Sequence, residues 1–268
     1  MKRSHPLAFF LLAAALIGGC GQKSKKNQAE ENPAEDGKQN RNGSSTAVET
    51  ENTDLKKPDA PAQGAPSAPV SPLKISYPFA INGNTNPFLA GAISSAVIAY
   101  PESIDTAENN SPVQVVPMGS SCLEAGQILS FQVEGKVAYS TLPEHMSEAD
   151  GLPSTIVRHS LGSLNELSDI QGPINSLVAV FLDSSPPSAR AQAPQSLDFS
   201  EAAAREFKYL TPKIGQIFFI GNGKDSTGAS QSFIVPKGAS RLYLAALDEF
   251  DWNNNQGRYS GVISCRKI

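Results

Sequence analysis

Short apolar stretches separated by polar turns characterise the chain from residue 73 to its end. In residues 128–134, apolar and polar side chains alternate, as expected for a strand with one face in a core and the other in water. Similar stretches are rich in β-branched or aromatic side chains and are bounded by Gly, Pro, Asn or Ser. The predicted strands are residues 76–81, 97–100, 113–116, 127–139, 177–182, 214–220, 232–235, 241–247 and 259–265. Such a series of short strands predicts an all-β fold, a β-sandwich over residues 73–268.

Two long polar segments interrupt this series of strands, residues 141–172 and 183–210. The first contains His145 and is expected to form a loop or a brief helix. In the second, Ser200 is a suitable N-cap for a helix that would continue through three alanines. We therefore predict a helix of about two to three turns within residues 199–207.

The first 19 residues have the pattern of a signal peptide. Lys2 and Arg3 precede an apolar run over residues 7–17, and two small residues follow it. A spanning helix needs about 20 apolar residues, so this run is too short to be one. The pattern predicts export from the cytoplasm.

Residues 16–20, Leu-Ile-Gly-Gly-Cys, resemble the lipobox of bacterial lipoproteins. The resemblance implies that Cys20 becomes the mature N-terminus and carries the lipid, with palmitate among its acyl chains, so that the protein is anchored to the bilayer. Gly21 stands where an Asp would resemble the inner-membrane retention signal, which favours the outer membrane in a diderm cell envelope. The alternative is a simple signal peptide that happens to end before a Cys.

Residues 20–72 contain almost no aliphatic or aromatic side chains. Such a segment cannot bury enough apolar surface to offset its ordering entropy, so we expect a disordered tether. A flexible chain of this length spans roughly 40 Å on average.

With Cys20 assigned to the lipid, Cys122 and Cys265 remain of the three cysteines. In an oxidising compartment such as the periplasm, an even pair predicts a disulfide that joins the last strand to an early one. The alternative is two buried free thiols.

Charge and motifs argue against two classes of function. The formal net charge of −4 is unsuited to nucleic acid, which needs a basic face. The Gly-rich residues 221–225 lack the Ser or Thr of a phosphate-binding loop, and no Gly-x-Ser-x-Gly elbow occurs. Neither His145 nor His159 has neighbours in the pattern of a zinc site or a catalytic triad, so we expect no enzyme activity.

An oxygen-rich loop, residues 248–255, separates the last two predicted strands. It contains Asp248, Glu249, Asp251, Asn253, Asn254 and Asn255. A tight turn would need far fewer such residues, and hard oxygen ligands suit Ca²⁺. An EF-hand fits poorly, because Gln256 and Val262 occupy the positions of its required Gly and Glu. The alternative is a solvated turn whose Asn side chains cap their own backbone.

Residues 231–262 resemble the C-terminal half of the galactose-binding-like sandwich of the PA-I type galactophilic lectins. The resemblance lies in Val-Pro-x-Gly at 235–238, Arg-Leu-Tyr-Leu at 241–244, an Asp, and Asn-Asn-x-Gly at 254–257. Residues 126–131 and 135–139 resemble an early strand and a Tyr-bearing turn of the same family. The resemblance implies a jelly-roll sandwich that binds Ca²⁺.

The family's metal ligands carry over to the side chains of Asp248, Asn254 and Asn255 and to the carbonyls of Asp251 and Tyr139. Nothing in residues 141–172 aligns with the His and Gln that contact the sugar in that family, and His159 is the one candidate.

These residues predict a lipid-anchored envelope protein that binds Ca²⁺ and, through Asp248, Asn254, Trp252 and His159, a glycan. Trp252 could stack on a sugar if it is exposed; the alternative is a ring folded onto the edge of the sandwich. The alternative function is a scaffold or adhesion protein that binds a protein partner instead of a glycan.

Overall fold

The structure is a computed structural model that describes residues 74–101, 103–158 and 162–266. The predicted signal peptide, the predicted lipidation site Cys20, the predicted tether and His159 all lie outside these residues. Within the described ranges the fold is all-β, as predicted. No described helix is long and apolar enough to cross a membrane.

The larger sheet has the strand order β1-β14-β4-β12-β10, and β5 pairs with β4 beside it. Its strands are β1 (Ile75–Asn82), β14 (Gln256–Arg266), β4 (Ile128–Ala138), β12 (Ser232–Ile234), β10 (Tyr209–Leu210) and β5 (Met146–Ser147). The long β14 is paired along its length on both sides, with β1 and with β4, always antiparallel. This strand therefore links the first and last parts of the described chain.

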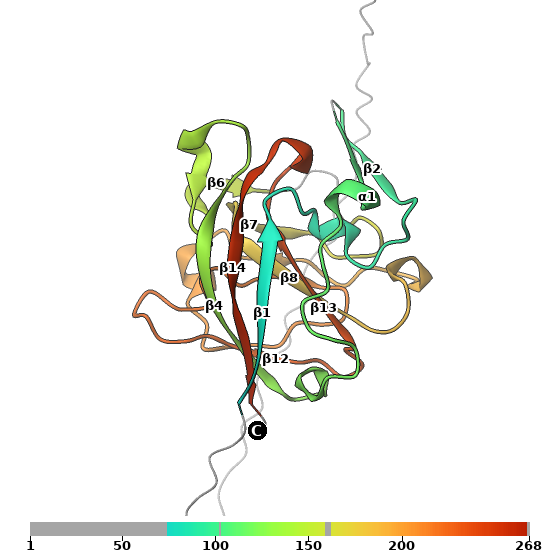
Figure 1. Cartoon of the computed structure of the whole chain (residues 1–268), viewed down its shortest axis with the longest axis vertical. Coiled ribbons are helices and arrows are strands. Elements are labelled where there is room, and N and C mark those ends of the chain that lie inside the picture. The colour runs from blue at the N-terminus through green and yellow to red at the C-terminus, as the bar shows by residue number, and fades with distance from the viewer. Residues whose placement is uncertain (1–73, 102, 159–161, 267–268) are drawn as a thin grey trace, which may run out of the picture. The chain divides into compact units, whose positions relative to one another are not determined.

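A second sheet has the order β11-β8-β13. It consists of β11 (Ile217–Phe219), β8 (Leu177–Leu182) and β13 (Arg241–Ala246). Every residue of β8 is buried, which explains its continuous apolar sequence. Figure 1 shows β1, β14 and β4 in front of β8 and β13, and one core cluster contains side chains from both sheets. The arrangement is that of a β-sandwich.

Smaller elements surround the two sheets. They are the hairpin of β2 (Val97–Ala99) and β3 (Ile104–Thr106), the sheet of β6 (Leu152–Val157), β7 (Ile170–Ile174) and β9 (Leu197–Asp198), and the short helix α1 (Ala107–Asn110). The 3-10 turns are η1 (Pro87–Leu89), η2 (Ser121–Leu123), η3 (Pro143–His145), η4 (Pro187–Ala189), η5 (Ala202–Arg205) and η6 (Trp252–Asn254).

The predicted strand at residues 113–116 is wrong. This segment forms one isolated bridge, Gln114 with Tyr243, and a backbone bond from Val115 N to Leu242 O. Pro112 and Pro117 flank it, and a proline has no N–H to continue a ladder. The segment is therefore an extended edge of the second sheet that cannot become a full strand.

The predicted helix in residues 199–207 is also wrong, because only the turn η5 forms there. Phe199 contacts the ring of Phe219, and Phe207 contacts the ring of Phe233, so both ends of the segment are anchored in the core. The guanidinium of Arg205 donates to the carbonyls of Phe199 and Ser200, which removes these acceptors from a helical ladder. Tertiary packing overrides the helix propensity of the alanines.

Residues 141–172 are not the loop or brief helix that we predict from their polarity. After η3 they contribute β5, β6 and the start of β7. β5 pairs with β4, and β6 pairs with β7. These backbone pairings form regular strands in a segment whose polar sequence does not indicate them.

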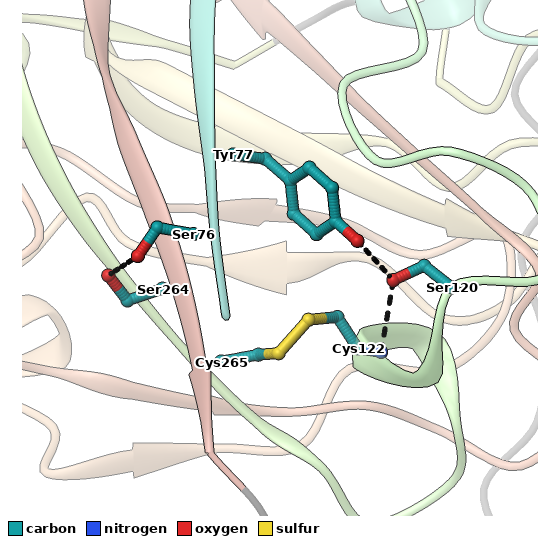
Figure 2. The surroundings of a disulfide bond; sticks show 6 residues. All are labelled: Ser76, Tyr77, Ser120, Cys122, Ser264 and Cys265. Atoms are coloured by element: carbon teal, nitrogen blue, oxygen red, sulfur yellow. Dashed lines mark hydrogen bonds between the residues drawn. A yellow bond between two sulfur atoms is a disulfide. The ribbon is translucent and has the colours of Figure 1, made fainter. Parts of the chain in front are cut away.

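Cys122 and Cys265 lie at disulfide distance, with their Cα atoms 5.6 Å apart, as predicted (Figure 2). Cys265 belongs to β14, but Cys122 lies in η2, ahead of β4, and not in an early strand. The hydroxyl of Ser120 accepts from Cys122 N at 3.2 Å and lies 2.8 Å from the hydroxyl of Tyr77 in β1. The disulfide and these bonds hold η2 against the larger sheet.

Candidate metal site

The oxygen-rich loop leaves β13 at Ala246 and enters β14 at Gln256. Its turn depends on Asp251, which has a left-handed backbone with φ of 64°, a conformation that Asp tolerates better than most residues. The amide of Asn254 donates to Oδ2 of Asp251 at 2.7 Å and closes the turn. The conformation of the loop is therefore set partly by its own polar side chains.

Trp252 anchors the loop in the core. Its side chain is fully buried, its Nε1 donates to Ala246 O at 2.8 Å, and its ring lies 5.9 Å from that of Tyr100. The ring of Phe88 packs edge-on at 6.2 Å. Of the two alternatives for Trp252, the exposed ring that stacks on a sugar is wrong, and the ring packed into the sandwich describes the structure.

Asp248 is the first acidic residue of the loop and is only 3% exposed. Its Oδ1 accepts from the N–H of Glu249 at 2.6 Å, whereas its Oδ2 is buried and has no hydrogen-bond partner in the structure. Burial raises the pKa of Asp248 to about 8, although the neighbouring Glu249 N–H and Asn255 amide lower it. A buried carboxylate in this state needs a proton or a cation.

Asp105 in β3 belongs to the same cluster, although the sequence did not single it out. It is fully buried, and its Oδ2 accepts from Asn86 Nδ2 at 2.9 Å and from Trp252 N at 3.4 Å. Its Oδ1 is buried without a partner. Burial raises the pKa of Asp105, and the negative charge of Asp105 in turn raises the pKa of Asp248. The two carboxyl groups are therefore close enough to interact.

The amide oxygens of the loop complete the set. The Oδ1 atoms of Asn254 and Asn255 are both buried and without a hydrogen-bond partner. The Nδ2 of Asn255 donates to Gly83 O at 3.2 Å, which fixes the orientation of that amide. Asp105, Asp248, Asn254 and Asn255 thus each present one buried oxygen that no described donor satisfies, and leaving such groups unpaired costs about 1–3 kcal/mol each.

The two residues predicted to supply carbonyl ligands, Tyr139 and Asp251, are neighbours of cluster residues in the sheet and in the loop. The antiparallel pairing of β4 with β14 places Ala138 opposite Gln256. The next residue of each chain segment, Tyr139 and Asn255, therefore lies at the end of this pairing. The ring of Tyr139 stacks on His145 at 4.3 Å. The carbonyl of Asp251 accepts from Asn254 N at 3.4 Å, so one of its two lone pairs is engaged within the turn.

The chemistry of this donor set fits a hard cation. Two carboxylate and two amide oxygens, with carbonyls at the rim, are ligands of the type that Ca²⁺ takes, usually six to eight in number. Among the described residues, no group of three or more His, Cys, Asp or Glu side chains could hold a metal, so the candidate site depends on amide and carbonyl oxygens beside its two carboxylates. Asp105 could not be found from the sequence because it stands in a short polar hairpin about 140 residues before the loop.

No protein-family model, curated protein or solved structure matches this chain.

Proposed function

We propose that this domain binds one Ca²⁺ ion through Asp105, Asp248, Asn254 and Asn255, with the carbonyls of Asp251 and Tyr139 as further ligands. The observation that supports it is that Asp105, which contacts the loop at Trp252 N, and three residues of the loop each have a buried side-chain oxygen without a hydrogen bond. A divalent cation would satisfy all four and balance the two carboxylates, which a solvated turn that caps itself would not require.

We also propose that the domain is the folded part of a lipid-anchored envelope protein with no enzyme activity, attached through Cys20. The lectin-like jelly roll and the glycan remain predictions from the resemblance. The burial of Trp252 removes the aromatic surface proposed for sugar stacking. It favours the alternative function, a scaffold or adhesion protein in which Ca²⁺ stiffens the oxygen-rich loop.

The test is thermal melting of the full-length protein with millimolar Ca²⁺ and with chelator. A ligand that binds only the native state stabilises it by about 2.7 kcal/mol at one hundred times its dissociation constant. For a domain of this size that corresponds to a rise in Tm of roughly 5–10 °C.

Asp248→Asn and Asp105→Asn should each abolish most of this rise. Asp198→Asn is the matched control, because Asp198 is exposed in β9 and far from the loop in sequence. Without Ca²⁺ at pH 8, Asp248→Asn should melt no lower than the wild type, because it removes a buried charge. An equal rise in wild type and Asp248→Asn would refute the assignment.

A further inference from the structure

A second candidate site lies at the other end of β14 from the oxygen-rich loop. A pocket of about 370 Å³ is lined there by Lys74, Ser130, Ser230, Ser232, Ser264, Cys265 and Arg266. At about 3.3 Å per residue, the 11 residues of β14 separate this serine pocket from the loop by roughly 30 Å. The two sites are therefore independent of each other.

The strand register creates the floor of the serine pocket. Ser264 in β14 pairs with Ser76 in β1 on one side and with Ser130 in β4 on the other, so their side chains share one face of the sheet. In the antiparallel pairing of β12 with β4, Phe233 stands opposite Leu129. Ser232 of β12 therefore lies opposite Ser130 and extends the row of serines. The hydroxyls of Ser76 and Ser264 lie 3.2 Å apart and form a hydrogen bond (Figure 2).

Apart from the bond between Ser76 and Ser264, the serine hydroxyls of the pocket are unused. Ser232 is only 8% exposed, yet no hydrogen bond joins its hydroxyl to any described residue. The hydroxyls of Ser130 and Ser230 also have no partner among the described residues. A nearly buried hydroxyl that points into a pocket without a partner is a donor available to a ligand.

Two cations stand at the mouth of the serine pocket. Lys74 and Arg266 are both exposed, and neither forms an ion pair with a described residue. No carboxylate lines the pocket. The nearest acid along the chain from Ser230 is Asp225, whose Oδ1 already accepts from Thr227 and Ala229 and which lines a different pocket. Both ionisable side chains that line the pocket are therefore positive, in a protein with a net charge of −4.

We propose that the serine pocket binds a phosphate group, either as a free anion or within a phosphodiester headgroup. An Arg guanidinium presents a fork of N–H donors that matches phosphate oxygens, a Lys adds a point charge, and the serine hydroxyls donate to the remaining oxygens. The pocket is larger than a single phosphate, which leaves room for the substituents of a diester.

Isothermal titration calorimetry on the full-length protein in calcium-free, low-salt buffer tests this proposal. The probes are inorganic phosphate and glycerophosphoglycerol, a soluble phosphodiester headgroup. Arg266→Gln removes one charge-assisted contact and should weaken binding about tenfold. Ser232→Ala removes one hydroxyl and should weaken binding by roughly a few-fold. Arg258→Gln, an exposed arginine on the same strand, is the matched control and should bind within about twofold of wild type.

Tighter binding of the diester would identify a lipid headgroup as the natural source, and tighter binding of inorganic phosphate would identify a free anion; either result supports the proposal. Absence of binding by both probes, or affinities equal in Arg266→Gln and Arg258→Gln, would overturn it. The result of the Ca²⁺ melting experiment has no bearing on either outcome, because this titration contains no Ca²⁺.

Discussion

The buried carboxyl group of Asp248 has to be neutralised by a proton or by a cation. Its exposed fraction is 3%, one of its oxygens has no donor, and a second buried carboxyl, Asp105, lies within electrostatic range. Protonation and Ca²⁺ binding are therefore competing ways to satisfy one site. If Ca²⁺ occupies the proposed site, Asp248 is unprotonated in both the native and the unfolded state, so the stability should change little with pH in the window in which it falls without the metal.

Without Ca²⁺, the free energy of unfolding should fall as the pH rises from about 4 to about 8. Burial raises the pKa of Asp248 from 3.8 to about 8, so in this window the native state retains a proton that the unfolded chain releases. Above pH 8 this contribution should level off. Ca²⁺ should stabilise the protein more strongly as the pH rises through the same window.

Urea unfolding at pH 5, 7 and 9, in chelator and in Ca²⁺, measures both trends. Asp248→Asn is the control, since it should flatten the metal-free profile. A metal-free stability that increases steadily across this window, and equally in the variant, would contradict the assigned burial of Asp248.

At the scale of the elements, the pairing of β4 with β14 restricts which residues can stand in the two strands. Their backbones approach so closely at some positions that only a glycine fits there. Gly135 in β4 has φ of 101°, and a Cβ built on it would lie 2.3 Å from Arg258 O in β14. No flexible side chain is available to yield at this contact. The register of β14, the strand that follows the oxygen-rich loop, therefore depends partly on Gly135 in β4.

Gly135→Ala should destabilise the protein more than Gly119→Ala. Gly119 also has a positive φ of 77°, but a Cβ there would meet nothing within 4 Å. The Gly119→Ala variant should lose about 1 kcal/mol from backbone strain alone. Gly135→Ala should lose a further 1–3 kcal/mol or so from overpacking, measured by urea unfolding. Equal losses in the two variants would show that the close approach of β4 and β14 does not affect the free energy of unfolding.

At the scale of the whole molecule, the Cys122–Cys265 pair closes most of the described chain into one loop. The sequence separation is 143 residues, and both cysteines are buried beside the larger sheet. Cross-linking over so long a loop removes many conformations from the unfolded chain.

The double variant Cys122→Ala/Cys265→Ala should therefore lose up to about 4–5 kcal/mol of stability. Denaturant unfolding of the oxidised wild type, the reduced wild type and the variant measures it. Reduced wild type and variant should agree within about 1–2 kcal/mol, because both lack the cross-link and the variant additionally loses only the packing of two buried sulfur atoms. Identical midpoints for oxidised and reduced protein would show that the bond does not constrain the unfolded state.

The sequence by itself determined the features that depend on local pattern. The strand at 128–138 follows from alternating apolar and polar residues, because a strand with one buried face buries every second side chain. The strand at 177–182 follows from a continuous apolar run, because both of its faces are buried. The clustered oxygens of residues 248–255 and the even cysteine pair are likewise visible without a fold.

Only the tertiary structure decided which distant groups meet. It brought Asp105 of β3 to the loop, buried Trp252 against Tyr100, and replaced an alanine-rich helix by a turn anchored through Phe199 and Phe207. It also aligned serines from three strands, β4, β12 and β14, in one pocket. The physical reason is that register and packing are set by contacts between residues far apart in the chain, and these contacts leave no mark in the local order of residues.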